Sequence, residues 1–333
     1  MVATVKRSAE QEYEIDILTK KLNDAKTPHV LFKGVVIRNY YPAKEMRTMG
    51  DIDILVKDED RDKSHKLIQK LGFAAGLTIG EVWDYTKSSV HLEIHTQIMY
   101  HNISNGVDYV SYFSDVWNNV VPSSKGYSYE LTDEYHFLYL IVHMAKHFDG
   151  SGCGIRMIMD IAMYLIYFEG RLDFNYLNRE IEKLHLTLFT KNIFILCRVW
   201  FDIKSGEIPI MEEHLYKDLS RYILDSGTFG FYQRNKYVGI IRNGYIGENG
   251  LLSRLVILKT CRKFCFPSYR DMSNTSYYPF LKNRPFLVPI AWIYRFGRCT
   301  LKECKNPFRL LIGITKCKEE SKKQYEVICK LGL

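Results

Sequence analysis

The sequence has no long hydrophobic run. A membrane-spanning helix needs about 20 consecutive apolar residues, and the longest candidate near the end, Pro285–Tyr294, is much shorter and contains two prolines. The first residues also lack an apolar segment behind their positive charges, which a secretory signal requires. We therefore expect a cytoplasmic protein without a transmembrane segment.

Common catalytic and metal-binding motifs are missing as well. None of the eight cysteines belongs to a C-x-x-C pair, so the sequence favours reduced thiols over a zinc site. There is no P-loop, no G-x-G-x-x-G, no G-x-S-x-G, no H-E-x-x-H and no His-Asp dipeptide. These absences count against the enzyme classes that those motifs mark.

The composition is that of an ordinary globular protein, but its charge is uneven. The 333 residues are 47% hydrophobic and 25% charged, which is enough material for two domains. The net charge of +8 is concentrated near the end, because residues 251–333 hold 17 Lys and Arg against 5 Asp and Glu. Such a segment can meet nucleic acid, a phosphorylated substrate or an anionic membrane face, or form a solvated basic surface.

The order of hydrophobic patterns predicts an α+β protein in three parts. Residues 1–125 combine an amphipathic helix over residues 7–25 with apolar strands. The strands are expected at "HVLFKG", "DIDILV", "VWDYTK" and "VHLEIHTQI". Residues 126–250 are expected to form a helical domain, and residues 251–333 a basic helical segment packed on the rest.

Two carboxylates stand inside an otherwise apolar strand, "GDIDILV" at Gly50–Val56. Because side chains alternate between the faces of a strand, Asp51 and Asp53 project side by side. In "VHLEIHTQI" the same alternation puts Glu93 on a polar face. If the two strands are neighbours, Glu93 is a third carboxylate in a cluster that suits Mg²⁺. The alternative is an edge strand with one polar, wet face.

A Lys-Gly turn precedes these carboxylates in the chain. Lys33 and Gly34 end the strand "HVLFKG" and open a helix, so backbone N–H groups and a lysine are offered to a phosphate. Arg47, four residues before Asp51, is a candidate to pair with a phosphate or with Asp51 itself. The alternative for the turn is an ordinary glycine turn.

The run "LFKGVVIRNYYPAKEMRTMGDIDILV" holds a K-G turn, a Tyr-Pro pair, an arginine and D-I-D in a strand. It resembles the bacterial nucleotidyltransferase-like family of uncharacterised nucleotidyltransferases, a divergent branch of the DNA polymerase β-like superfamily. The similarity continues in "HLEIH", where Glu93 and His95 match an E-x-H strand, and in "HMAKHF" and "IRMIMDIAMYL". It extends to "YPFLKNRPFLVPIAWIYRFGR" and thus touches most of the chain.

The resemblance implies a small mixed sheet with helices and a Mg²⁺-dependent transfer of a nucleoside monophosphate from an NTP to a hydroxyl. Asp51, Asp53 and Glu93 would hold two Mg²⁺ about 3.5–4 Å apart, and Glu93 would also accept the proton of the acceptor. Lys33 and Gly34 would contact the triphosphate, although the superfamily's usual turn is Gly-Ser or Gly-Gly. The acceptor is a sugar, a peptide or a protein that these residues do not identify.

Further residues are candidates for contacts in a cleft. His143, Lys146 and His147 lie on the helix predicted in "TDEYHFLYLIVHMAKHF", and with His95 they could contact the nucleotide or the acceptor. The spacing of His143 and His147 at i and i+4 can also bind a transition metal, but a structural role is more common. Asp160 on the next helix is interpreted as an ion-pair partner of Arg156.

Two hypotheses from other classes stay open. One is a catalytically inactive nucleotide-binding or interaction module with the same fold. The other, not favoured, is a nucleic-acid-binding protein that uses the basic C-terminal segment. Loss of pyrophosphate release on Asp51→Asn/Asp53→Asn would separate the enzyme from both.

Overall fold

The computed structural model describes most of the chain and divides it into two compact units. The described residues are 2–76, 82–103, 105–123, 126–150, 152–203, 211–230, 262, 265–273, 277–303 and 325–333. The first unit comprises Met1–Lys146 and Arg156–Ile210, and the second His147–Ile155 and Met211–Leu333. Each unit is described by itself, and the predicted boundaries near residues 125 and 250 stay predictions.

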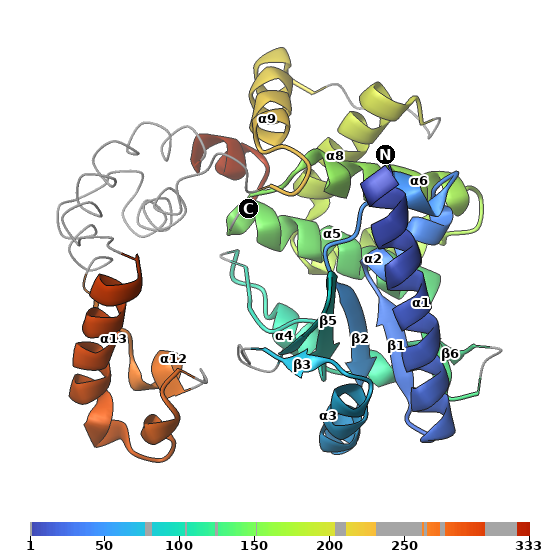
Figure 1. The fold of residues 1–333 in the computed structure, drawn as a ribbon. Coiled ribbons are helices and arrows are strands. Elements are labelled where there is room, and N and C mark those ends of the chain that lie inside the picture. Colours follow the sequence, from blue (N-terminus) through green and yellow to red (C-terminus); the bar gives the residue numbers. More distant parts are fainter. Residues whose placement is uncertain are drawn as a thin grey trace. The chain divides into compact units, whose positions relative to one another are not determined.

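The first unit is built on a seven-stranded sheet with the strand order β3-β4-β5-β2-β1-β7-β6 (Figure 1). The strands are β1 (His29–Phe32), β2 (Ile52–Val56), β3 (Ala74–Ala75), β4 (Trp83–Lys87), β5 (Val90–His95), β6 (Val120–Pro122) and β7 (Ser128–Leu131). β2 runs antiparallel to β1 and parallel to β5. The predicted α+β class is confirmed in this form, a mixed sheet with many helices.

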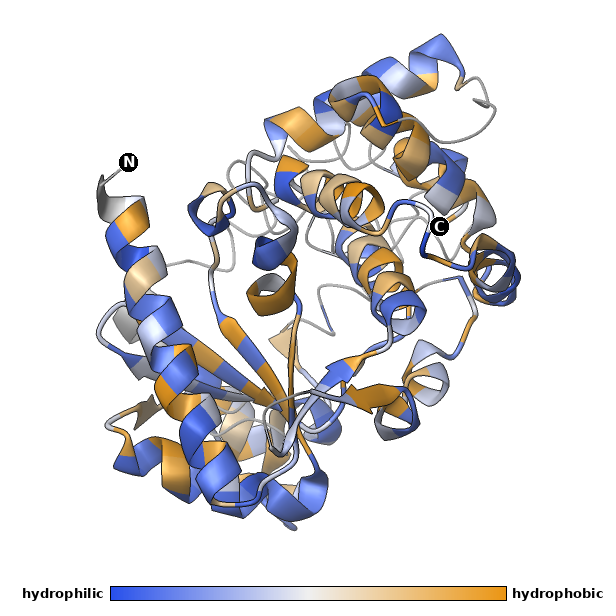
Figure 2. Cartoon of the chain, turned by 90° about the vertical axis from the view of Figure 1, so that its right-hand side faces the viewer, coloured by the Kyte–Doolittle hydropathy of each residue, from blue (hydrophilic) through white to orange (hydrophobic). Residues whose placement is uncertain are grey.

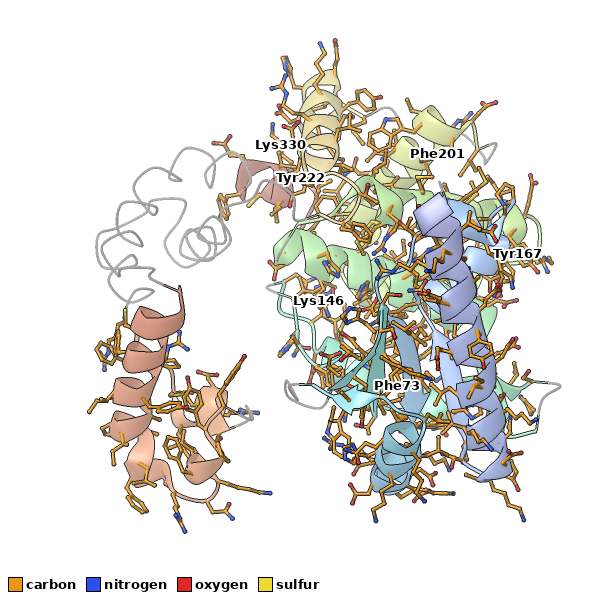
Figure 3. All side chains as sticks on the ribbon, viewed as in Figure 1. Phe73, Lys146, Tyr167, Phe201, Tyr222 and Lys330 are labelled. Atoms are coloured by element: carbon orange, nitrogen blue, oxygen red, sulfur yellow. The ribbon has the colours of Figure 1, made fainter. Side chains whose placement is uncertain are left out.

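One face of the sheet is apolar and is covered by two helices. These are α1 (Val2–Asp24) and α3 (Arg61–Lys70). Figure 2 shows the central strands mainly in hydrophobic colours, whereas α1 also carries hydrophilic positions. Strand residues Ile52, Ile54 and Val56 join one buried cluster with Leu18 and Leu22 of α1, Ile68 of α3 and Phe73, which is labelled in Figure 3. Burial of this face fixes the register of β2, because a shift by one residue would turn the aspartates into the core.

The opposite face of the sheet meets α5 (Asp133–Asp149) through aromatic side chains. The ring of Phe32 at the end of β1 meets the ring of Tyr139 edge-on, with centroids 5.8 Å apart. Phe113 contacts Tyr139 in the same manner. This face also carries Asp53 and Glu93, so α5 covers the side of the sheet where the carboxylates lie.

Short helices and a helical layer complete the first unit. They are α2 (Gly34–Ile37), α4 (Tyr109–Tyr112), α6 (Ile155–Tyr167), α7 (Phe174–Lys183) and α8 (Thr187–Phe201), with 3-10 turns at Arg38–Tyr40, Lys44–Met46, Asp58–Asp60 and Val116–Asn118. The second unit contains α9 (Glu213–Asp225), α12 (Tyr269–Ser273) and α13 (Val288–Glu303). Within that unit, Tyr278, Leu281 and Ala291 belong to a small buried cluster.

Several expectations from the sequence can be compared with these elements. The strands and the strand pair β4–β5 are confirmed, and the first helix begins earlier than predicted, at Val2. The sheet continues beyond residue 125, because β7 pairs with β1. Cys197, Cys265 and Cys329 are free thiols. The side chains of Cys261, Cys299, Cys304 and Cys317 lie outside the described residues. Within the described part of the chain, no helix has the length and hydrophobicity to cross a membrane.

A histidine is buried at the start of α5. His136 is 3% exposed, and the ring of Tyr164 meets it edge-on at 5.6 Å. Burial lowers the pKa of His136 to about 4, because the charged imidazolium would lose its hydration. The folded protein therefore keeps this ring neutral over most of the acidic range.

We expect this histidine to make the fold sensitive to acid. The unfolded chain binds a proton below a pKa of 6.5 and the folded chain only below about 4. The contribution to the free energy of unfolding is therefore full above pH 6.5 and is lost as the pH falls to 4, by up to ~3 kcal/mol. Urea unfolding at a series of pH values measures it. The variant His136→Leu should lack this slope, and an unchanged slope in that variant would contradict the assignment.

Candidate active site

The register of two parallel strands brings the predicted carboxylates together. Asp53 of β2 and Glu93 of β5 are paired residues in the ladder, so their side chains share one face of the sheet. His95, two residues further along β5, lies on the same face. Its Nε2 atom is 2.9 Å from Asp53 Oδ1 and 3.2 Å from Glu93 Oε2. The three ligand atoms all lie within 4.8 Å of one another.

A lysine compensates the buried aspartate. Lys33 Nζ lies 2.6 Å from Asp53 Oδ1, and the Asp53 side chain is 2% exposed. Burial alone would lower the pKa of Lys33, but the charge of Asp53 raises it above its usual range. Burial alone would raise the pKa of Asp53, but Lys33 and His95 hold it below its usual range. Both groups are therefore charged, and the strand tolerates a buried aspartate because Lys33 compensates its charge.

The third carboxylate, Asp51, stands just before β2. The charge of Asp53, together with burial, raises the pKa of Asp51 to about 6. Glu93 adds to this effect and Lys33 opposes it. The charges of all three carboxylates thus act on Lys33. Because carboxylate oxygens are the ligands that hard divalent cations take, this donor set fits a metal ion.

The Lys-Gly turn lies directly beside the cluster. Lys33 has φ 54° and ψ −128°, a backbone conformation that is rare for residues with a side chain. Such strain costs about 1–3 kcal/mol and is concentrated at functional sites. The next residue opens α2, and a Cβ atom on Gly34 would lie 2.6 Å from Arg47 Nη1. A side chain at position 34 would therefore have to displace the guanidinium of Arg47.

Arg47 packs against this turn and is itself held by an ion pair. Its Nε and Nη2 atoms donate to the two carboxylate oxygens of Asp160 at 2.7 and 2.8 Å. The hydroxyl of Tyr41 donates to Asp160 as well, at 2.8 Å. The remaining nitrogen, Arg47 Nη1, is buried and has no hydrogen-bond partner among the residues that the structure describes. The sequence predicts Asp160 as a partner of Arg156, and in the fold Asp160 forms a buried ion pair with Arg47. Burial lowers the pKa of Arg156 and the charge of Asp160 acts to raise it, while Arg156 Nη1 donates to the carbonyl of Thr48.

We expect the Arg47–Asp160 pair to be important for stability. The variant Asp160→Asn leaves a buried guanidinium without its counter-charge, which should lower the free energy of unfolding by about 3–5 kcal/mol. The control Tyr41→Phe removes one hydrogen bond to the same carboxylate and should cost about 1 kcal/mol. Urea unfolding of both variants checks the order. Equal losses would show that the ion pair is not what holds this segment.

A profile of a protein family matches residues 1–202 of the chain, well over half of its length. The family is described as uncharacterised nucleotidyltransferase. The chain belongs to this family. The match includes all of the strands, the three carboxylates and the Lys-Gly turn. No curated protein and no solved structure matches the chain.

The remaining site residues predicted for this nucleotidyltransferase family member lie on α5. Lys146, labelled in Figure 3, has its pKa lowered by burial and by the charge of Lys33, while Glu93 and Asp53 act to raise it. It is therefore close enough to the cluster to interact with its charges. His143 Nδ1 lies 3.5 Å from the hydroxyl of Tyr139. His147 belongs to the second unit, so its role in a cleft stays a prediction.

Some residues of the site had no local signal in the family member's sequence. The hydroxyl of Tyr100 lies 3.4 Å from His95 Nδ1 and accepts a hydrogen bond from the backbone N–H of Gln97. Tyr41 and Asp160 also belong to the surroundings of the site. The contact of Tyr41 with Asp160 joins segments far apart in the chain. The alternation of side chains along β5 is the signal that places His95 beside Glu93.

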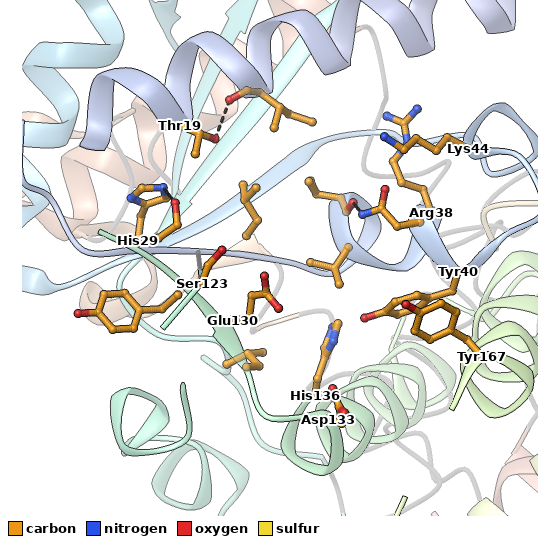
Figure 4. Close-up of a pocket in the computed structure, with 18 of the residues that line it drawn as sticks. Thr19, His29, Arg38, Tyr40, Lys44, Ser123, Glu130, Asp133, His136 and Tyr167 are labelled. Carbon is orange, nitrogen blue, oxygen red and sulfur yellow. Dashed lines mark hydrogen bonds between the residues drawn. The ribbon is translucent and has the colours of Figure 1, made fainter. Parts of the chain in front are cut away.

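A separate cavity of about 570 Å³ lies between α1, α2, β7 and the start of α5 (Figure 4). Glu130, Asp133 and His136 are among the residues that line it, and Tyr40 and Tyr167 stack at 4.3 Å at its edge. Its lining does not include the carboxylates of the cluster. We therefore place the candidate site at the oxygen and nitrogen atoms of Asp53, Glu93 and His95 and not in this cavity.

Proposed function

We propose that the protein is a nucleotidyltransferase of the DNA polymerase β-like type, which moves a nucleoside monophosphate from an NTP to a hydroxyl of an acceptor. The pairing of Asp53 with Glu93 in adjacent strands, with Lys33 on the same face, is the observation that carries this proposal. Family membership supports the transfer of a nucleotidyl group. The acceptor would be a sugar, a peptide or a protein.

The carboxylates would hold two Mg²⁺ ions. Such ions neutralise the charge that develops on the transferred phosphoryl group and orient the attacking and leaving oxygens. Asp53 lies between the other two acids, so it is the residue expected to serve both ion positions. Asp51 and Glu93 would each complete one of them. The raised pKa of Asp51, caused first by the charge of Asp53, supports a place for cations here.

The chain's own groups would divide the remaining work. Lys33 would exchange its contact with Asp53 for an oxygen of the triphosphate, and the backbone N–H of Gly34 would donate to the same group. Arg47 Nη1 lies next to Gly34 and has no partner within the described part of the chain, so it would be a further donor on that side. Glu93, whose side chain is 31% exposed, would accept the proton of the acceptor hydroxyl.

The bond changes are those of an in-line displacement. The acceptor oxygen forms a bond to the α-phosphorus of the NTP as the bond from that phosphorus to the bridging oxygen breaks. Pyrophosphate leaves with that bridging oxygen, and the acceptor's proton passes to Glu93. Positioning and charge neutralisation supply most of the acceleration in such reactions.

The test is incubation with each labelled NTP, Mg²⁺ and a panel of sugar, peptide and protein acceptors. Pyrophosphate release and label transfer should be present in the native protein and absent in Asp51→Asn/Asp53→Asn. Metal-dependent NTP binding without any turnover would instead support an inactive binding module. Binding to DNA or RNA that weakens steeply with salt and survives the two substitutions would support a nucleic-acid-binding protein.

A further inference from the structure

The imidazole of His95 contacts both carboxylates that face each other across β2 and β5. Its Nε2 atom is within 3.2 Å of oxygens from two different carboxylates, Asp53 and Glu93. Neighbouring ligands of a metal ion at about 2.1 Å in octahedral geometry are about 3.0 Å apart. These two separations lie close to that value, and the oxygens of Asp53 and Glu93 lie within 4.8 Å of each other. The three atoms can therefore share one ion once Lys33 gives up its contact with Asp53 Oδ1.

We propose that His95 is a metal ligand and that the position formed with Asp53 and Glu93 selects a divalent first-row transition ion over Mg²⁺. This inference rests on the proposed function, because it concerns one of the two ion positions of that site. Mg²⁺ is bound by oxygen atoms and dehydrates reluctantly. Imidazole nitrogen is a better ligand for transition ions than for Mg²⁺. A set of two carboxylates and one imidazole therefore favours ions such as Mn²⁺, Fe²⁺ or Zn²⁺.

The surroundings of His95 can accommodate the change of proton position that ligation needs. In the present geometry Nε2 donates to carboxylates, so this nitrogen carries a hydrogen. A ligating Nε2 must be free of hydrogen, and the ring then carries it on Nδ1. The hydroxyl oxygen of Tyr100, 3.4 Å from Nδ1, can accept that hydrogen. Such an outer contact fixes the tautomer of a metal-binding histidine.

The burial of the ring agrees with this role. His95 is 3% exposed, and its ring meets that of Phe32 edge-on at 5.1 Å. The ring therefore approaches the carboxylates in one fixed orientation, as a rigid ligand should. His91 lies on the same strand but is exposed, so it provides a matched control.

The experiment uses Mn²⁺ as the probe with the full chain. Free Mn²⁺ is counted by electron paramagnetic resonance during titration, and Mg²⁺ affinity is obtained by competition. We expect the native protein to bind Mn²⁺ at least about tenfold more tightly than Mg²⁺. The variant His95→Asn, which offers an oxygen in place of nitrogen, should lose this preference, and His91→Asn should retain it. Pulsed measurements on the bound ion should show coupling to an imidazole ¹⁴N nucleus in the native protein, which needs no variant to fold.

The outcomes separate this inference from the proposed function. Bound Mn²⁺ without ¹⁴N coupling, or equal affinities for Mn²⁺ and Mg²⁺, would overturn the role of His95 and leave transfer with Mg²⁺ intact. Absence of binding by either ion up to millimolar concentration would overturn both. Coupling to nitrogen in a protein that shows no transfer would support the metal site and reject the enzyme.

Discussion

Replacing Asp53 with asparagine is expected to lower the rate of nucleotidyl transfer by at least about 1,000-fold, since a metal ion supplies several kcal/mol of charge stabilisation. Asparagine keeps the size of the side chain and removes its charge. Asp53 is the carboxylate that contacts both Lys33 and His95, so its loss affects every part of the cluster. The measurement is kcat at saturating NTP and metal. The control Asp58→Asn changes an aspartate whose side chain is 84% exposed and should leave kcat unchanged.

The same substitution also disturbs the fold, and the two effects have to be separated. Asp53→Asn leaves the ammonium of Lys33 next to a neutral amide, and breaking such a buried pair costs about 3–5 kcal/mol. The double variant Asp53→Asn/Lys33→Met removes both charges and should recover much of the free energy of unfolding. It should remain inactive. Recovery of transfer in the double variant would show that Asp53 acts through stability and not through the reaction.

The carboxylate cluster could be predicted from the sequence because a strand has a strict two-residue period. Asp51 and Asp53 had to share a face once the isoleucines between and after them were assigned to the core. Glu93 joined them by the same rule, on the condition that β5 lies next to β2. That condition came from the resemblance to a family, and the strand pairing bears it out.

The compensating charges could not be predicted in the same way. Lys33 reaches Asp53 because β1 and β2 are antiparallel and the lysine stands where β1 ends. The pairing of Arg47 with Asp160 joins residues 113 positions apart, so no local spacing could reveal it. The i, i+4 rule pointed to Arg156 instead, since that rule describes an isolated helix and not its neighbours. Likewise, β7 has the largely polar sequence SYEL, so only its parallel pairing with β1 shows that it belongs to the sheet.

Replacing Lys33 with methionine should have opposite effects on the two ligands of the site. A charge-assisted hydrogen bond contributes about 1.5–3 kcal/mol, so its loss should raise the KM for NTP by about 10- to 100-fold. Metal binding without nucleotide should become tighter, by about tenfold or more, because a positive charge 2.6 Å from Asp53 Oδ1 no longer competes for that oxygen. Mn²⁺ titration and NTP kinetics on one protein preparation measure both.

These opposite shifts distinguish a lysine that changes partners from one that only stabilises the fold. In the absence of metal, Lys33→Met removes the ion pair of Asp53 with Lys33 and keeps its contact with His95, so the variant should unfold at a lower temperature than the native protein. Added Mn²⁺ should then raise its melting temperature by more than it raises that of the native protein, because a ligand that binds only the folded state stabilises it more the tighter it binds, by RT ln(1 + [Mn²⁺]/Kd). The variant Lys33→Arg, which keeps a positive charge, should show neither gain. If the metal affinity of Lys33→Met is unchanged or weaker, Lys33 does not compete with the ion for Asp53. Its contact with Asp53 then serves the fold and not the reaction.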